Sequence, residues 1–278
     1  MVFYNNWQLV VLVEKYDVRF KKRFGQNFLK DINVVKRIVD VSGVNEKSLV
    51  IEVGPGGAIM TRELASRVKN VLAYEIDEEL SEELYKRIED FSNVDVLFQD
   101  FLEADLLTDV KHYKNDNIYF VSNVPYYITT PILLKLLQSG IHFKKIVMMV
   151  QKEVGERFCT APGSREYGSI TVLLNYFYNI KKEFNVSRKQ FIPEPNVDSM
   201  IVSFTEKDDK LKLNDFKLFE RILKDSFQFK RKTIRNNLKQ YDLKVVEKVL
   251  AEFGYDLNVR AEMLEVEVFV EMANALSK

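Results

Sequence analysis

The stretch "VIEVGPGGAIMTREL", residues 50–64, predicts a strand, a glycine turn and a helix in direct succession. Its first residues form an apolar run, and its last residues have the spacing of an amphipathic helix. Gly54, Gly56 and Gly57 carry no Cβ, so the backbone of the turn can approach a ligand closely. Such a turn could equally be a tight strand-to-helix connection, and other features must decide between these interpretations.

Strands and helices alternate around this stretch. Apolar strand-like runs occupy residues 48–53, 70–76, 94–98, 117–122, 144–151, 171–178 and 199–204. Segments of helical length and pattern separate the first five runs, and one of them, 32–43, ends at a glycine as helices commonly do. The alternation predicts an α/β protein with a mostly parallel, seven-stranded sheet covered by helices on both faces. The last two runs could form an antiparallel edge.

The pattern changes after Phe204. A charged, linker-like stretch follows, and beyond it three or four short amphipathic helices are expected. We therefore predict a domain boundary near residue 206, between an α/β domain over 19–206 and a helical domain over 207–278. Residues 1–18 are an apolar extension whose role the sequence does not indicate.

Composition limits the class of protein. The chain has 278 residues, of which 46% are hydrophobic, enough for one large or two ordinary domains. No apolar run is long enough to cross a bilayer, and "LVVLV" near the N-terminus lacks the flanks of a signal peptide. The predicted compartment is therefore the cytoplasm.

Cysteine and histidine are too scarce for most metal sites. The single cysteine, Cys159, excludes an intrachain disulfide and a multi-cysteine metal site, and we expect it to be a buried thiol. His112 and His142 lie far apart without a motif around either. No metal and no catalytic histidine are expected.

The charges are segregated although the formal net charge is zero. Residues 19–30 and 224–239 are strongly basic, whereas residues 75–90 are strongly acidic. A basic face for nucleic acid can coexist with a neutral total. Each basic segment could equally be the solvated face of a helix.

Two acids follow the next two strands and indicate a nucleoside ligand. Glu75 ends the strand after Gly54, where an acid commonly holds ribose hydroxyls. Ile59 stands where a dinucleotide-binding turn has its third glycine, which favours a ligand without phosphates, such as S-adenosylmethionine. Asp100 follows the third strand and could contact the adenine amine, or could simply cap a helix.

A second loop, "FVSNVPYYIT" at residues 120–129, has the chemistry for an adenine substrate. Pro125 ends the strand, so the loop lies at the sheet edge where α/β proteins bind ligands. The Asn123 side-chain oxygen and the carbonyl of Val124 or Pro125 could accept hydrogen bonds from the exocyclic amine. Tyr126 could stack on an extruded base. The alternative is a proline-terminated strand with a core tyrosine.

A set of motifs in fixed order then resembles one family. These motifs are "FGQNFLKD", "IEVGPGGAIMT", "YEID", "QDFLEAD", "SNVPYYITTPIL", "MMVQKEVGERF", "YGSITVLLNYF", "FIPEPNVDSMIVSF" and "FKRKTIRNNL". From Arg19 to the C-terminus the chain resembles the ribosomal RNA adenine dimethyltransferase family. The resemblance implies a class I, Rossmann-like S-adenosylmethionine-dependent methyltransferase domain and a small all-helical C-terminal domain that binds RNA.

The resemblance also implies an activity and its partners. The activity is methylation of N6 of two adjacent adenosines near the 3′ end of small-subunit rRNA, giving N6,N6-dimethyladenosine, with a role in subunit biogenesis. The cofactor is S-adenosyl-L-methionine and the partner is the small ribosomal subunit. A monomer without metal or membrane association is expected.

Site residues carry over by position. The implied cofactor contacts are Asn27, Leu29, Gly54, Gly56, Glu75, Ile76, Asp100, Phe101 and Asn123. The implied catalytic residues are Asn123, Pro125, Tyr126 and Phe191, the last as a second aromatic wall around the target base, although alone it would suit a core. The predicted RNA-binding residues are Lys22, Arg23, Lys230, Arg231, Lys232 and Arg235, and Lys232 and Arg235 are expected to share a helical face.

Two positions depart from the pattern of the family, and two alternative functions remain open. Tyr127 stands where many members have Asn, and Ser122 where many have Gly, so base fit could differ. The chain could instead be a large-subunit rRNA adenine methyltransferase of the macrolide-resistance type. It could also be a non-catalytic RNA-binding assembly or transcription factor on the same fold.

Overall fold

The computed structural model describes residues 27–115 and 117–277. Lys22 and Arg23, and the N-terminal extension, lie outside the described residues. The chain divides into two compact units, one that runs to Gly155 and includes Lys182–Phe204, and one formed by Glu156–Lys181 and Thr205–Lys278. The segment Glu156–Lys181, which the sequence suggested as part of the α/β domain, thus groups with the C-terminal helices.

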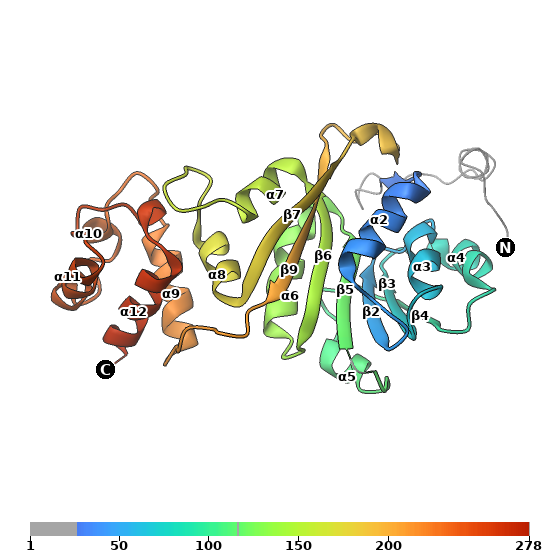
Figure 1. Ribbon diagram of the computed structural model, residues 1–278, viewed down its shortest axis with the longest axis horizontal. Helices are drawn as coiled ribbons and strands as arrows, with labels where there is room; N and C mark the ends of the chain where they lie inside the picture. The colour runs from blue at the N-terminus through green and yellow to red at the C-terminus, as the bar shows by residue number, and fades with distance from the viewer. Residues whose placement is uncertain (1–26, 116, 278) are drawn as a thin grey trace. The chain divides into compact units, whose positions relative to one another are not determined.

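A seven-stranded sheet with the order β4-β3-β2-β5-β6-β9-β7 forms the frame (Figure 1). Its strands are β2 (Ser48–Val53), β3 (Asn70–Glu75), β4 (Val94–Phe98), β5 (Asn117–Asn123), β6 (Phe143–Gln151), β7 (Tyr178–Val186) and β9 (Ser199–Glu206). β2 pairs in parallel with β3 and β5, β3 with β4, and β5 with β6. The predicted mostly parallel sheet of seven strands is confirmed. A separate two-stranded ladder joins β1 (Phe28–Leu29) to β8 (Phe191–Ile192) in antiparallel register.

One strand prediction was wrong. Residues 171–178 belong mainly to helix α8 (Ser169–Phe177), and the strand follows as β7. The run "TVLLNYF" is apolar almost throughout, and periodicity alone does not distinguish a buried helix from a buried strand in so short a run. The true strand, "YNIKKEFNV", is largely polar, which hid it in the sequence.

Helices follow the strands of the first unit. They are α2 (Ile32–Ser42), α3 (Ile59–Ala65), α4 (Ser81–Ile88), α5 (Leu106–Val110) and α6 (Thr129–Gln138). Asp31 caps the start of α2 by accepting a hydrogen bond from the Asn33 N–H, and Gly43 ends it in the left-handed conformation. Every residue of β2 is buried, as expected for a strand covered on both faces.

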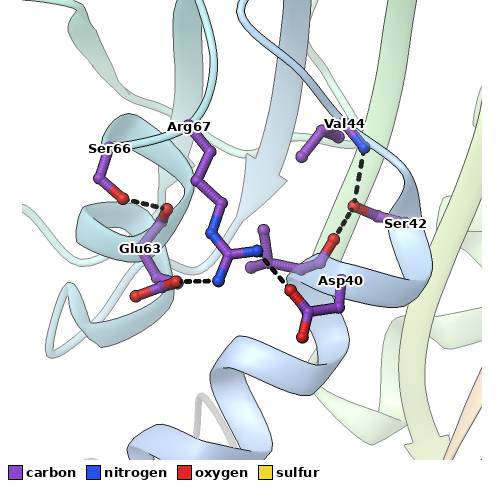
Figure 2. Close-up of polar contacts among 7 residues, drawn as sticks. Asp40, Ser42, Val44, Glu63, Ser66 and Arg67 are labelled. Atoms are coloured by element: carbon purple, nitrogen blue, oxygen red, sulfur yellow. Dashed lines mark hydrogen bonds and ion pairs between the residues drawn. The ribbon is translucent and has the colours of Figure 1, made fainter.

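Helices α2 and α3 pack side by side over the sheet. Val35 and Ile38 of α2 and Leu64 of α3 share a core cluster with β-strand residues such as Val50. At the surface, Arg67 pairs with Asp40 at the end of α2 and with Glu63 of α3 (Figure 2). Burial supplies most of the stabilisation, because such partly exposed ion pairs contribute only about 0–1 kcal/mol each. The packing anchors α3, which begins directly after the glycine turn.

The second unit is helical. Its C-terminal part consists of α9 (Phe216–Ser226), α10 (Ile234–Asn237), α11 (Leu243–Glu252) and α12 (Val266–Leu276). Rings from separate segments pack together in this unit, for example Phe227, directly after α9, with Phe269 of α12 at 5.7 Å between centroids. The predicted helical C-terminal region is confirmed. Cys159, which follows α7 (Lys152–Phe158), is exposed, so the expectation of a buried thiol was wrong.

Neither a membrane-spanning helix nor a metal-ligand cluster occurs among the described residues. None of their helices is long and apolar enough to cross a membrane. Within the same residues, histidine, cysteine and acidic side chains nowhere form a group of three suited to a metal ion.

Candidate cofactor and substrate-base site

A cavity of about 200 Å³ opens at the carboxyl ends of the parallel strands. β3 and β4 extend the sheet on one side of β2, while β5 and β6 extend it on the other. The strand order therefore reverses between β2 and β5, where open α/β sheets bind their ligands. Every predicted cofactor and catalytic residue except Phe191 lines the cavity, namely Asn27, Leu29, Gly54, Gly56, Glu75, Ile76, Asp100, Phe101, Asn123, Pro125 and Tyr126.

The glycine turn that follows β2 forms one wall of the cavity. Gly54 and Gly56 both have positive φ, at 72° and 48°. A Cβ on Gly56 would lie 2.5 Å from the ring of Phe28, so a larger residue would displace that ring. The Gly54 N–H donates to the Tyr74 carbonyl at 2.8 Å, which fixes the turn to β3. Glycine is needed here for conformation and for close approach.

Glu75 faces this turn from the end of β3. Its Oε2 accepts a hydrogen bond from the Gly56 N–H at 3.2 Å, and its Oε1 accepts one from the Asp77 N–H at 3.0 Å. The residue is only 4% exposed. Burial raises the pKa of the Glu75 carboxyl, although the two backbone donors oppose that shift. The carboxylate is therefore held in one orientation at the cavity wall.

Glu52 is a site residue that the sequence analysis did not single out. It lies in β2, lines the cavity and is 1% exposed, and its Oε2 has no hydrogen-bond partner among the described residues. Burial raises its pKa to about 8, the hydroxyl of Thr61 opposes the shift, and the charge of Glu75 adds to it. The signal was available, since Glu52 is the one charged residue in a fully buried strand.

Arg87 is a second residue that was missed. From α4 it lines the cavity, and its guanidinium donates to the Gly57 carbonyl at 3.2 Å. Its Nε donates to Glu83, one turn earlier, at 2.7 Å. The pair clamps the glycine turn from the neighbouring helix. Only the i, i+4 spacing was visible in the sequence, and this spacing is common on solvated helices.

The other side of the cavity is suited to a flat, apolar ring with a polar edge. Ile76 is 45% exposed, so an apolar ligand can cover it. Asp100 accepts a hydrogen bond from the Leu102 N–H at 2.8 Å, and this bond caps a turn and not a helix. Phe101 is buried, with its ring edge-on to Tyr74 at 5.2 Å.

Asn123 is the last residue of β5 and faces the same cavity. Its Nδ2 donates to the Asn27 carbonyl at 3.2 Å. This bond connects the segment before β1 to β5 and uses the donor end of the amide. The acceptor end, Oδ1, has no protein donor among the described residues and remains available to a ligand.

The loop beyond Asn123 holds its two tyrosines differently. The Tyr126 hydroxyl shares a hydrogen bond with the Ser199 hydroxyl at 2.7 Å, which fixes the ring. Tyr127 is 59% exposed, and no hydrogen bond of its side chain is formed within the described residues. The Pro125 carbonyl accepts from the Ile128 N–H at 3.1 Å in the short helix that carries both tyrosines. Tyr126 is therefore preorganised, whereas Tyr127 is not.

Ser122 has a structural role. Its hydroxyl donates to the Val53 carbonyl at 2.7 Å and accepts from the Val53 N–H at 3.3 Å. The regular pairing of β2 with β5 ends at Ile51 and Phe120. The hydroxyl thus joins the two strands where they separate to form the cavity.

The structure does not bring Phe191 to the cavity. The residue is 2% exposed, belongs to the core cluster and pairs with Leu29 in the β1–β8 ladder. The two prolines after it suggested a reaching loop, but the backbone ladder turns its ring inward. The proposed role as an aromatic wall has no support in this geometry.

The four predicted RNA-binding residues of the second unit are all exposed, but they do not form the expected helical face. Lys230, Arg231 and Lys232 lie in the turn between α9 and α10, and of the predicted cluster only Arg235 lies in a helix. The prediction of a shared helical face was wrong, because α10 begins only at Ile234. The cations remain close together through the turn.

The comparisons with known proteins agree with this geometry. The family model "Ribosomal RNA adenine dimethylase" matches residues 17–278. The chain belongs to that family. It is thus an S-adenosylmethionine-dependent rRNA adenine dimethyltransferase, and the predicted family, fold, cofactor and class of substrate are confirmed.

The names of the similar proteins include methyltransferases of small-subunit rRNA and one of 23S rRNA. The dimethylase is 41% identical over 276 residues to "Ribosomal RNA small subunit methyltransferase A" of Streptococcus equi subsp. zooepidemicus, covering 96% of this chain and 95% of the relative. The protein of the same name from Bacillus mycoides is 39% identical over 274 residues, with 95% and 94% covered. A dimethyladenosine transferase from Plasmodium falciparum has a TM-score of 0.75 at 25% identity, with 88% and 95% covered. The 23S rRNA methyltransferase ErmE has a TM-score of 0.70 at 25% identity, with 90% and 100% covered.

The residues present fit the cofactor of the family. A buried acid with an unpartnered oxygen, Glu52, suits the ammonium of a methionine tail. The turn at Gly56 has no side chain and so lets a ligand approach the backbone closely, and exposed Ile76 offers an apolar face to adenine. Arg87, the one cation among the described residues that line the cavity, already bonds to the Gly57 carbonyl and to Glu83, in agreement with a cofactor that has no phosphate.

Proposed function

We propose that this dimethylase converts two adjacent adenosines near the 3′ end of small-subunit rRNA to N6,N6-dimethyladenosine. The observation that carries the proposal is the Asn123 amide, which lines the cavity, donates through Nδ2 to the Asn27 carbonyl and leaves Oδ1 without a donor among the described residues. Support for the small subunit comes from relatives of about 40% identity over nearly their whole length. We infer further that the protein acts as a monomer in the cytoplasm during subunit maturation.

Cofactor binding is assigned to the glycine side of the cavity. Glu75 would accept hydrogen bonds from the ribose hydroxyls, because each carboxylate oxygen can accept more than the one bond it now has. The Asp100 carboxylate would accept from the adenine amine. Glu52 would pair with the ammonium group and become deprotonated on doing so, since an adjacent cation lowers the pKa of a carboxyl.

Methyl transfer is assigned to the Asn123 loop. The cofactor supplies a methyl group that its sulfonium makes electrophilic. The Asn123 Oδ1 and one backbone carbonyl would accept from the two N6 hydrogens of adenine, which directs the nitrogen lone pair at the methyl carbon. The Pro125 carbonyl is already used by Ile128, so the Val124 carbonyl is the better candidate.

The rest of the loop holds the substrate base. Tyr126, whose hydroxyl is anchored on Ser199, would stack on the extruded adenine. Transfer would form the bond between N6 and the methyl carbon as the carbon–sulfur bond breaks, and the N6 proton would pass to water. Orientation of the reactants can supply about 7–11 kcal/mol of the lowered barrier. Such a site needs no histidine or cysteine.

A second candidate substrate is large-subunit rRNA, because the fold is similar to that of ErmE. Purified small and large subunits lacking the modification should be incubated with the protein and S-adenosylmethionine. Mass spectrometry of the rRNA should show dimethylation of adjacent adenosines in the small subunit only. Methylation confined to the large subunit, or none on either, would overturn the proposal.

A further inference from the structure

The turn between α9 and α10, residues 228–232, presents an aromatic ring among cations. Phe229 is 58% exposed, and Lys230, Arg231 and Lys232, which follow it, are all exposed. Single exposed apolar side chains are common on proteins and need no explanation. The surroundings of Phe229 distinguish it from such residues, and we call residues 228–232 the basic turn.

The backbone of the basic turn is fixed by hydrogen bonds from a buried side chain. Asn237 is buried, and its Nδ2 donates to the Ser226 carbonyl at 2.6 Å and to the Phe229 carbonyl at 3.3 Å. The Phe229 carbonyl also accepts from the Lys232 N–H at 2.8 Å. A buried amide thus supports the residue whose ring is exposed. Binding to such a preformed turn loses less conformational entropy than binding to a flexible loop.

The segment after the turn is anchored as well. The Ile234 N–H donates to the Val259 carbonyl at 2.8 Å, and the Arg235 N–H donates to the Leu257 carbonyl at 3.0 Å. These bonds fix the end of the basic turn to the loop that follows α11 within the same unit. The ring and the cations are therefore presented in a defined arrangement.

The cations of the turn differ in availability. The Lys230 Nζ donates to the Arg165 carbonyl at 3.5 Å. One of its three N–H donors is therefore already used within the protein. Arg231 and Lys232 have no ion-pair partner among the described residues and are available to phosphates.

We propose that Phe229 stacks on an unpaired rRNA base while Arg231 and Lys232 hold the phosphates on either side. Cations alone would suit any RNA backbone, but a protruding ring requires a base that is free of its partner, as in a loop or bulge. Recognition at the basic turn then has two parts, a salt-dependent part from the cations and a salt-independent part from the ring. The inference rests on the proposed function, since it takes the ribosomal subunit as the ligand.

Binding of the full-length protein to purified small subunits tests the inference over a series of salt concentrations. Phe229→Ala should weaken binding about 5- to 100-fold and leave the salt slope unchanged. Phe229→Tyr should bind like the wild type, because it keeps the ring. Phe229→Leu should bind like the alanine variant, because it keeps apolar area but cannot stack. Phe253→Ala, an exposed phenylalanine elsewhere in the same unit, is the matched control and should have no effect.

The proposal is overturned if Phe229→Ala binds within about twofold of the wild type, or if Phe229→Leu restores full affinity. A photoreactive phenylalanine at position 229 gives an independent result. Its crosslink should go to rRNA, whereas a crosslink to a ribosomal protein would refute base stacking. Unchanged cofactor affinity and thermal stability of the variants exclude a folding defect. If the wild type binds and methylates only large subunits, the proposed function fails, and the same titration on large subunits still decides the role of Phe229.

Discussion

The cavity of the first unit and the basic turn of the second recognise their ligands by opposite means. In the cavity, buried carboxylates such as Glu75 are oriented by backbone donors. In the basic turn, exposed cations such as Arg231 extend into water. Buried hydrogen bonds provide geometry that salt hardly screens, whereas exposed charges provide affinity that falls as salt rises. Mutations in the two regions should therefore differ in kind as well as in magnitude.

The largest effect is expected at Asn123. Asn123→Ala removes an acceptor from the target amine, and turnover should fall to the limit of detection. Some reduction of cofactor affinity should accompany it, because the hydrogen bond to the Asn27 carbonyl is removed as well. Single-turnover methylation with cofactor and subunits both saturating measures this effect. If the single-turnover rate constant keeps more than about a tenth of its wild-type value, the barrier has changed by less than about 1.4 kcal/mol, and the amide is not an essential acceptor.

The second largest effect is expected from charge reversal of the basic turn. Replacing Lys230, Arg231 and Lys232 together with Glu should weaken subunit binding and lower the salt slope by about 0.7–0.9 log units for each phosphate that is no longer neutralised. Affinity for free S-adenosylmethionine should not change. Lys244→Glu combined with Lys248→Glu on α11 tests whether any change in net charge has the same effect. A wild-type slope in the triple variant would mean that the turn is only solvated surface.

The Glu52 carboxyl should contribute to the pH dependence of the free energy of unfolding. Its pKa is raised to about 8 in the folded protein. Between its unfolded pKa, near 4.5, and this value the folded state binds more protons, so the free energy of unfolding should fall as pH rises. Between pH 6 and 8 the fall should be about 2–3 kcal/mol. Denaturant titrations of Glu52→Gln should lack this part of the dependence, and identical pH profiles would contradict a buried neutral acid.

Removal of the Glu75 carboxylate should weaken cofactor binding and leave subunit binding unchanged. Glu75→Ala should reduce S-adenosylmethionine affinity by about 1.5–3 kcal/mol, because it removes charge-assisted hydrogen bonds to the ribose. Calorimetry measures this reduction directly. Glu78→Ala, an exposed acid close by in the chain that does not line the cavity, provides the control. Equal affinities for the Glu75 variant and the wild type would place the ribose elsewhere.

The smallest effect is expected at Tyr127. Its exposed ring lacks the hydroxyl anchor that fixes Tyr126 on Ser199. Tyr127→Asn should change kcat/KM by less than about threefold, or roughly 0.6 kcal/mol, whereas Tyr126→Ala should lose a base stack of about 1–3 kcal/mol. Steady-state kinetics on subunits compare the two variants. A larger effect at Tyr127 would show that the unanchored ring, and not the anchored one, holds the base.

The position of the site and much of its lining could be predicted from the sequence. Gly54, Glu75, Asp100 and Asn123 were each recognised at or just after the end of a predicted strand. Parallel strands bring their carboxyl ends to one edge of a sheet, so chain position alone predicted that these residues would meet. Short-range chemistry, such as proline ending a strand and glycine permitting a positive φ, is encoded locally.

Which side chains are buried and which are presented depended on the three-dimensional packing. The packing buried Phe191 in the core, left the Glu52 carboxylate without a partner among the described residues and placed Lys230 and its neighbours in a turn. It also made the apolar run 171–178 mainly helical. Each of these outcomes depends on contacts between residues distant in the chain, and burial in such contacts overrides local propensity. The sequence pattern of one segment does not specify which other segment of the chain will pack against it.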